Sequence, residues 1–297
     1  MKRKSIMFAG MTIQNAKERL LFQLYHIYDQ REAGNISDWV LEHLTGWKKI
    51  DRIINKNLEL NKSQAETLER YIDELSNHRP VQYVLGEAWF QGMRFFVNES
   101  TLIPRPETEE LVEWVVSDYK EVSQTQQLVV LDVGTGSGCI PISIVKKLPS
   151  CRVISCDISK EAVAVAQGNA VSLGAEAEFI VSDILNEASW DNFPQLDIIV
   201  SNPPYIPASE KSNMSANVLN HEPHEALFVP DNNALLFYEV IARLASRKLK
   251  AKGRMYFEIH ESLAEPVTRL LEKEGFQEVV VRKDMQGKDR MVSSRKS

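Results

Sequence analysis

The sequence contains few cysteines, and none of them is placed as a redox or zinc motif requires. Its three cysteines, Cys139, Cys151 and Cys156, form no C-x-x-C pair, and an odd number cannot all be joined in disulfides. Disulfide scaffolds and cysteine-ligated zinc sites both need paired or closely spaced cysteines. We therefore expect reduced intracellular thiols, no disulfide framework and no metal centre.

Long apolar runs and an excess of positive charge are missing as well. No apolar segment approaches the roughly 20 residues that cross a bilayer, and the basic amino terminus lacks the sustained apolar stretch of a signal peptide. The net charge is −6, whereas a protein that neutralises many phosphates carries clustered lysine and arginine. We expect a cytoplasmic protein with no membrane partner and no direct nucleic-acid partner.

The first third of the chain has the pattern of helices rather than strands. Apolar residues recur at helical spacing over residues 1–85, which predicts a small helical domain. Gly46 is expected at the C-cap of one helix, and Ser63–Glu66 has the pattern of a capping box at the start of another. A β-hairpin linker is expected over 86–104, with its turn at Gln91-Gly92.

The remainder, residues 105–297, alternates short apolar runs with amphipathic stretches. Pro106 suits the first turn of a helix. The seven runs predicted to be strands are 128–133, 153–156, 179–181, 196–200, 255–259, 276–281 and 291–293. Alternation of this kind is typical of a doubly wound α/β domain, so we expect a Rossmann-like, mostly parallel seven-stranded sheet.

A glycine-rich segment, Asp132-Val-Gly-Thr-Gly-Ser-Gly138, joins the first of these strands to the next helix. Its glycines permit a tight turn and let a ligand approach backbone N–H groups. Cys139 stands where the dinucleotide fingerprint has its third glycine, which disfavours NAD, and no Gly-Lys-Ser/Thr follows, which excludes a P-loop. A tight turn without a ligand is the alternative. The candidate cofactor-binding residues here are Gly134, Thr135, Gly136, Ser137 and Gly138.

Acidic residues follow the next two predicted strands. Asp157 lies at the position where a carboxylate accepts hydrogen bonds from both hydroxyls of a ribose, although it also suits a helix N-cap ahead of Ser159. Asp183 and Ile184 could flank an adenine, with the carboxylate near the exocyclic amine and the Ile184 side chain on the ring face. A plain turn is the alternative for this pair.

The most specific motif is Asn202-Pro203-Pro204-Tyr205, which follows the fourth predicted strand. Two prolines fix φ and remove two N–H donors, so the loop offers an amide oxygen, a backbone oxygen and an aromatic face. Those groups form a receptor for a planar NH₂ group, unless the segment is only a proline-rich turn. We predict catalytic roles for Asn202, Pro203 and Tyr205, and substrate contacts from all four residues. Asn202 would also touch the cofactor.

Together these motifs describe a nucleoside site that lacks a phosphate-binding lysine or a metal cluster. S-adenosyl-L-methionine fits such a site, because it combines adenine and ribose with a methionine tail that carries a sulfonium. The Asn202 loop then places an NH₂ nitrogen in front of the methyl group.

The sequence resembles the HemK/PrmC family of protein-(glutamine-N5) methyltransferases, which act on peptide-chain release factors. The resemblance covers nearly the whole chain beyond the first helices, although the Asn-Pro-Pro-Tyr loop is shared with enzymes that methylate amino groups of DNA and RNA. The matching elements are Arg79–Gly86, Leu102–Glu109, Asp132–Gly138, Val200–Ile206, Glu222–Leu227 and Lys283-Asp284.

The resemblance implies that the acceptor is the glutamine of the Gly-Gly-Gln motif and that the helical domain and hairpin recognise the release factor. Three features depart from the family pattern. His260 stands where the family commonly has a glycine, and Ile184 stands where some relatives have Trp. The usual Asp-Gly-Leu before the later helix reads Asp231-Asn232-Asn233-Ala234-Leu235. The alternatives are a nucleic-acid adenine or cytosine amino methyltransferase and a non-catalytic nucleotide-binding scaffold.

Overall fold

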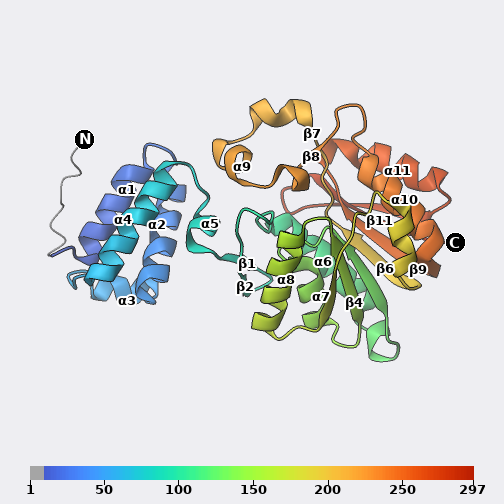
Figure 1. The fold of residues 1–297 in the computed structure, drawn as a ribbon, viewed down its shortest axis with the longest axis horizontal. Coiled ribbons are helices and arrows are strands. Elements are labelled where there is room, and N and C mark those ends of the chain that lie inside the picture. The colour runs from blue at the N-terminus through green and yellow to red at the C-terminus, as the bar shows by residue number, and fades with distance from the viewer. Residues whose placement is uncertain (1–9) are drawn as a thin grey trace. The chain divides into compact units, whose positions relative to one another are not determined.

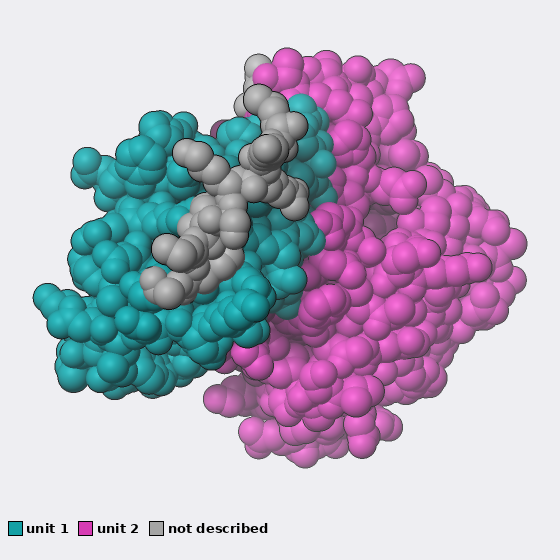
Figure 2. Space-filling view, turned by 60° about the vertical axis from the view of Figure 1, so that its left-hand side comes forward, with its two compact units in different colours: residues 1–86, 215–221 teal, residues 87–214, 222–297 magenta. Residues whose placement is uncertain are grey.

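The computed structural model describes residues 10–297, apart from the side chain of Asn213. The chain folds into two compact units, which Figure 2 shows in different colours. The first runs to Gly86 and also includes Ser215–His221, and the second contains the rest of the chain. The segment Ser215–His221 therefore packs with the first unit, although it lies far from it in the sequence.

The first unit is a helical bundle around an apolar core. Leu20, Val40 and Leu68 have no exposed surface. The predicted C-cap at Gly46 is confirmed, since this residue has φ +70° and its N–H donates to the Glu42 carbonyl oxygen. The helices of this unit are α1 (Ile13–Leu24), α2 (Gln30–Thr45), α3 (Lys49–Ile54), α4 (Lys62–Ser76), α5 (Val81–Leu85) and α9 (Ala216–His221).

The predicted capping box at Ser63–Glu66 is wrong. Helix α4 begins two residues earlier, and its N-cap is Asn61. The Asn61 side chain accepts from the Gln64 N–H at 2.9 Å, and the Gln64 side chain accepts from the Asn61 N–H at 3.0 Å. The extended segment before the helix fixes this start, because the Leu60 N–H donates to the Met11 carbonyl oxygen.

The second unit begins with the predicted hairpin, which joins β1 (Ala88–Phe90) to β2 (Met93–Phe95). Gln91 and Gly92 both have positive φ, at 51° and 71°. Two consecutive left-handed residues match the type I′ turn, whose twist suits a two-residue hairpin. Helix α6 (Pro106–Tyr119) follows, with proline in its first turn as predicted.

A seven-stranded sheet forms the centre of the second unit, and it confirms the predicted fold class. The strand order is β10-β11-β9-β6-β3-β4-β5, and only β11 runs antiparallel to its neighbours. The strands are β3 (Val129–Val133), β4 (Arg152–Asp157), β5 (Ala177–Val181), β6 (Leu196–Ser201), β9 (Leu249–Glu258), β10 (Gln277–Lys283) and β11 (Asp289–Arg295).

Helices cover both faces of this sheet (Figure 1). Because successive strand residues point to opposite faces, Val130 packs in the core beneath α6 and α7, and Leu131 packs in the core beneath α10. The remaining helices are α7 (Cys139–Lys147), α8 (Lys160–Leu173), α10 (Leu236–Lys248) and α11 (Ala264–Lys273).

The strand order reverses direction between β3 and β6, which is where open α/β sheets form their ligand crevice. Beyond β6 the chain makes a long excursion that includes a small parallel pair, β7 (Ile206–Pro207) with β8 (Phe228–Val229). The short 3₁₀ helices of the second unit are η1 (Val122–Gln124), η2 (Glu187–Asn192), η3 (Ala208–Asn213), η4 (His224–Ala226) and η5 (Glu261–Leu263).

Candidate active site

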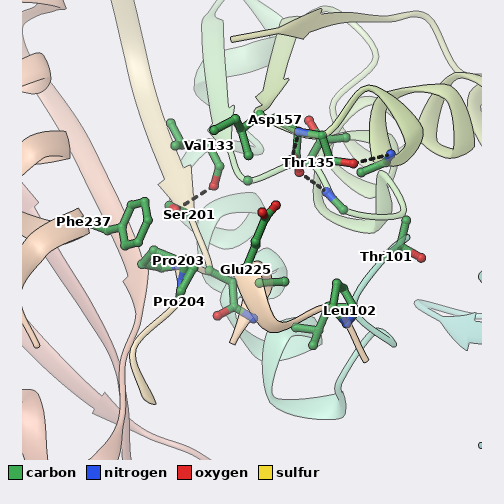
Figure 3. A pocket seen from close by; sticks show the side chains of 18 of the residues that line it. Thr101, Leu102, Val133, Thr135, Asp157, Ser201, Pro203, Pro204, Glu225 and Phe237 are labelled. Atoms are coloured by element: carbon green, nitrogen blue, oxygen red, sulfur yellow. Dashed lines mark hydrogen bonds between the residues drawn. The ribbon is translucent and has the colours of Figure 1, made fainter. Parts of the chain in front are cut away.

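A cavity of about 580 Å³ lies at the carboxyl ends of the parallel strands (Figure 3). Its walls come from the segments that follow β3, β4, β5 and β6, together with parts of 100–105 and 223–230. Among the residues that the sequence singled out for the site, all but Gly138 and Tyr205 line this cavity. The fold therefore brings the predicted cofactor and substrate motifs to one place.

The glycine turn after β3 needs left-handed backbone at three positions. Gly134, Gly136 and Gly138 have φ of +87°, +52° and +81°. A Cβ on Gly136 would meet no atom within 4 Å, whereas a Cβ on Gly138 would lie 3.0 Å from the Ala166 Cβ. Gly136 thus leaves open space beside the cavity, and Gly138 allows the start of α7 to pack against α8.

Asp157 anchors the glycine turn and lines the cavity. Its Oδ2 accepts from the Gly136 N–H at 2.9 Å, and its Oδ1 accepts from the Ser159 N–H at 2.9 Å. The N-cap of α8 is Ser159, whose hydroxyl accepts from the Ala162 N–H. Asp157 is therefore not the N-cap, and each of its oxygens keeps a lone pair after these contacts.

The segment after β5 supplies one apolar and one acidic wall residue. The Ile184 side chain is buried and packs in the core beside Trp190, whose indole N–H donates to the Ile184 carbonyl oxygen at 2.9 Å. Asp183 is exposed, and its Oδ1 accepts from the Leu185 N–H at 2.9 Å. Contacts of these residues with an adenine remain a prediction.

The Asn202 loop forms a further part of the cavity wall, next to the glycine turn. The Asn202 side chain donates from Nδ2 to Thr108 Oγ1 at 3.1 Å. A Cβ on Gly134 would lie 3.8 Å from the Asn202 carbonyl oxygen, so the two backbones nearly touch. Ser201 ties the strand ends together, because its hydroxyl donates to the Val133 carbonyl oxygen at 2.7 Å.

Tyr205 is not among the residues that line the cavity, and its partly buried ring packs against the core that contains Tyr238 and Phe257. Its hydroxyl donates to Glu258 Oε1 at 3.2 Å, and its ring centroid lies 6.1 Å from that of His260. Stacking of Tyr205 on a substrate amide stays a prediction. His260, one of the departures from the family pattern, thus contacts the loop through a ring.

Comparison with known proteins identifies the family. The family described as Methyltransferase small domain matches residues 118–229, and the PrmC N-terminal domain matches residues 26–86. The release factor glutamine methyltransferase of Flavobacterium psychrophilum is 43% identical over 95% of this chain and 98% of its own length. That of Bacteroides thetaiotaomicron is 40% identical over 91% of this chain and 95% of its own. The chain belongs to the release factor glutamine methyltransferase family.

Among solved structures, a methyltransferase from Pyrococcus furiosus has a similar chain trace. It is 16% identical, with 70% of this chain and 90% of that chain covered, at a TM-score of 0.49.

In this member of the family, sequence reasoning overlooked a buried carboxyl group next to the Asn202 loop. Glu258 is 2% exposed, and its Oε2 accepts from the Thr108 hydroxyl at 2.6 Å. Burial raises the pKa of Glu258 to about 7, against the hydrogen bond from Thr108, the charge of Arg290 and the hydrogen bond from Tyr205. Thr108 stood in the Pro-Arg-Pro-Glu-Thr-Glu element, which served only for the resemblance, and Glu258 stood in a predicted strand, 255–259, without a role of its own.

A second buried carboxyl group, Asp132, lies directly before the glycine turn. Its Oδ2 accepts from the Ser155 hydroxyl at 2.5 Å, and Oδ1 has no hydrogen-bond partner within the described chain. Burial raises the pKa of Asp132 to about 8, against the Ser155 hydrogen bond. The Ser155 hydroxyl also contacts the hydroxyl of Thr135. Asp132 is therefore linked through Ser155 to a residue of the glycine turn.

The cavity has a further wall that the sequence did not assign. Arg105 pairs with Glu222 at 2.5 Å, and the side chain of Glu222 is 1% exposed. The Ile103 N–H also approaches Glu222 Oε2, at 3.3 Å. This buried carboxylate joins 103–105 to the excursion beyond β6, and from η4 the Glu225 side chain extends into the cavity (Figure 3).

Two further observations concern metal sites and membrane spans in the described residues, 10–297. No group of three or more histidine, cysteine or acidic side chains is arranged there to hold a metal ion. None of the helices in that range has the length and apolar character needed to span a membrane.

Proposed function

We propose that this chain transfers a methyl group from S-adenosyl-L-methionine to the side-chain amide nitrogen of a glutamine, in the Gly-Gly-Gln motif of peptide-chain release factors. One observation carries the proposal: the Asn202 loop and the glycine turn with Asp157 face the same cavity. Membership of the release factor glutamine methyltransferase family supports the same substrate.

The residues of the cavity fit the cofactor. Bound there, S-adenosylmethionine supplies a methyl group activated by its sulfonium. The turn at Gly136 leaves room for close approach to the backbone, and the free lone pairs of Asp157 suit ribose hydroxyls. Ile184 offers an apolar surface to the adenine, and Asp183 offers a carboxylate to its exocyclic amine.

The chain's own contribution to the chemistry is positioning of the acceptor. An amide nitrogen is a poor nucleophile because its lone pair is delocalised. The side-chain oxygen of Asn202 and the carbonyl oxygen of Pro203 accept its two hydrogens, which aims the nitrogen and raises its electron density. Neither Pro203 nor Pro204 has an N–H to compete for these acceptors. We assign no general base, since positive charge developing on the nitrogen makes its proton acidic enough for water.

Recognition of the protein substrate is assigned to the helical domain, residues 1–85, and to the hairpin linker, residues 86–104. The match of residues 26–86 to the PrmC N-terminal domain supports a dedicated role for this region. A substrate that acts in translation places the activity in the cytoplasm. We expect no nucleic-acid or membrane partner.

The rival reaction is methylation of an adenine or cytosine amino group, because these also present a planar NH₂ to the Asn202 loop. A net charge of −6 disfavours binding along a phosphate backbone. A non-catalytic scaffold is disfavoured by the intact Asn202 at the cavity wall.

A methyl-transfer assay with labelled cofactor, offering release factor and DNA separately, tests the proposal. Label is expected in the release factor, and replacing its acceptor glutamine should remove it. Asn202→Ala should lower kcat by about 10²-fold, as loss of a preorganised polar group does elsewhere. Asn192→Ala, an exposed asparagine on η2, is the matched control and should retain wild-type turnover. Label in DNA with the release factor unmodified would reverse the assignment.

A further inference from the structure

We propose that Thr108 and Glu258 are positioning residues, which hold the Asn202 side chain with its oxygen toward the reacting amide. This inference rests on the proposed function, because it concerns the orientation of the Asn202 side-chain oxygen, which accepts a hydrogen bond from the glutamine NH₂. It assigns a role to two residues that the reaction as described above does not use.

The contacts form a continuous chain from the cavity wall into the core. Asn202 Nδ2 lies 3.1 Å from Thr108 Oγ1, and Thr108 Oγ1 lies 2.6 Å from Glu258 Oε2. The other carboxyl oxygen, Oε1, accepts from the Tyr205 hydroxyl at 3.2 Å. The residues come from the start of α6, the end of β9 and the loop after β6, so the fold assembles them from distant segments.

The direction of each hydrogen bond follows from the charge on Glu258. An ionised carboxylate only accepts, so the hydroxyl hydrogen of Thr108 must point at Glu258. Thr108 Oγ1 then has only lone pairs left, and it accepts from the NH₂ group of Asn202. A rotated amide would bring two oxygens together with no hydrogen between them. The NH₂ end is therefore fixed on Thr108, and the amide oxygen stays free for a ligand.

Protonation of Glu258 removes this constraint. A neutral carboxyl group can donate to Thr108, and the Thr108 hydroxyl can then donate to the oxygen of a rotated Asn202 amide. The rotated amide would offer NH₂ to the substrate NH₂, two donors that cannot pair. Turnover should therefore rise with pH as Glu258 ionises.

The surroundings of Glu258 determine the pH range in which its carboxyl group ionises. Burial raises its pKa to about 7, opposed by the Thr108 hydrogen bond, the Arg290 charge and the Tyr205 hydrogen bond, while Glu107 adds a smaller upward effect. The Tyr238 hydroxyl donates to the backbone carbonyl of Glu258 at 3.0 Å. The titratable and charged groups that face it are Glu107 of α6, Cys139 of α7, Tyr205 of the loop after β6, Tyr238 of α10 and Arg290 of β11.

Direct participation of Glu258 in proton transfer does not fit the geometry. The side chain does not line the cavity, and its two oxygens are occupied by Thr108 and Tyr205. Glu258 therefore acts through Asn202, as a positioning residue.

Isosteric substitution at Thr108 tests the inference. Thr108→Val removes the hydroxyl at nearly constant volume, and kcat for release factor methylation should fall about tenfold, the equivalent of one lost hydrogen bond. The affinity for S-adenosylmethionine should stay within about twofold, because Thr108→Val leaves the glycine turn and Asp157 intact. Thr108→Ser should restore kcat. Thr268→Val on α11, whose hydroxyl donates to the Ala264 carbonyl oxygen, is the matched control.

The pH profile separates orientation from a general structural defect. Wild-type kcat should rise with pH through the ionisation of Glu258, and Thr108→Val should lack that rise. Tyr205→Phe should move the rise to higher pH, because it removes a donor that favours the charged carboxylate. Wild-type kcat and an unchanged pH profile in Thr108→Val would overturn the inference.

A measurement without release factor distinguishes failure of this inference from failure of the proposed function. The side-chain NH₂ resonances of Asn202, assigned with Asn202→Ala, should titrate with Glu258 in the wild-type chain and stop doing so in Thr108→Val. Resonances that do not titrate in the wild-type chain would refute the orientation mechanism. Titrating resonances in a chain that methylates no release factor would instead refute the proposed function and leave the orientation supported.

Discussion

Replacement of Gly138 by alanine tests whether the glycine turn is needed for packing or only for its backbone shape. The residue has φ +81°, and a Cβ there would lie 3.0 Å from both the Ala166 Cβ and the Ile142 Cδ1. The left-handed backbone costs a residue with a Cβ about 1–2 kcal/mol, and overpacking costs about 1–3 kcal/mol more. Gly138→Ala should therefore lower the free energy of unfolding by about 2–5 kcal/mol.

Two other glycines of the same region provide controls. Gly136 has φ +52°, and a Cβ there would meet no atom within 4 Å. Gly136→Ala should therefore lower the free energy of unfolding only by the backbone contribution, about 1–2 kcal/mol. Gly168→Ala, on the exposed side of α8 and without a positive φ, should stabilise the chain by about 0.8–1 kcal/mol through helix propensity. Guanidinium unfolding followed by circular dichroism gives all three values. Equal losses for Gly138→Ala and Gly136→Ala would show that contact between α7 and α8 does not constrain the turn.

Three further predictions concern the cofactor, a buried acid and the helical domain. Asp157→Ala should weaken S-adenosylmethionine binding by about 1–3 kcal/mol, the cost of leaving hydroxyls unpaired, and unchanged calorimetric affinity in a folded variant would reject the ribose contact. Asp132 has a pKa raised from 3.8 to about 8, so its contribution to folding stability is complete below the lower value and disappears as pH rises to the upper one. Asp132→Asn should therefore gain stability relative to the wild-type chain over this range in thermal unfolding, and a pH-independent difference would contradict the raised pKa. Deletion of residues 1–85 should abolish methylation of intact release factor and preserve cofactor binding, whereas full methylation by the shortened chain would remove the recognition role.

The sheet and the position of the candidate cofactor residues around one cavity were predictable because their signals are local. Each strand is an apolar run with its own turn chemistry, and the glycine turn and Asp157 each follow one strand directly. Parallel strands carry their carboxyl ends to one edge, so residues that follow separate strands meet without any long-range information. The cavity accordingly unites Gly134, Asp157, Ile184 and Asn202.

The groups that the sequence did not reveal depend on contacts between distant segments. Thr108 and Glu258 are 150 positions apart and meet only because α6 packs against the end of β9. The misplaced start of α4 has a related cause. Asn61 and Ser63 both precede a Gln or Glu by three residues, and the local pattern cannot choose between them; in the structure Asn61 is the N-cap, directly after Leu60, whose N–H donates to the distant Met11 carbonyl oxygen.

In the proposed reaction the Asn202 loop presents the same acceptors to a glutamine amide and to an adenine amine, so we expect selectivity for a protein amide to come from outside that loop. The glycine turn and Asp157, which we propose hold the cofactor, do not distinguish the two substrates either. Beside the helical domain and hairpin, the part of the cavity left for this role is the wall built from 100–105 and 223–230, which no strand of the seven-stranded sheet supplies. The buried Glu222 carboxylate fixes that wall through Arg105. The Arg105 side chain is 34% exposed, but its loss would leave the buried Glu222 carboxylate without its ion-pair partner, which is costly, so this pair constrains the geometry of the wall.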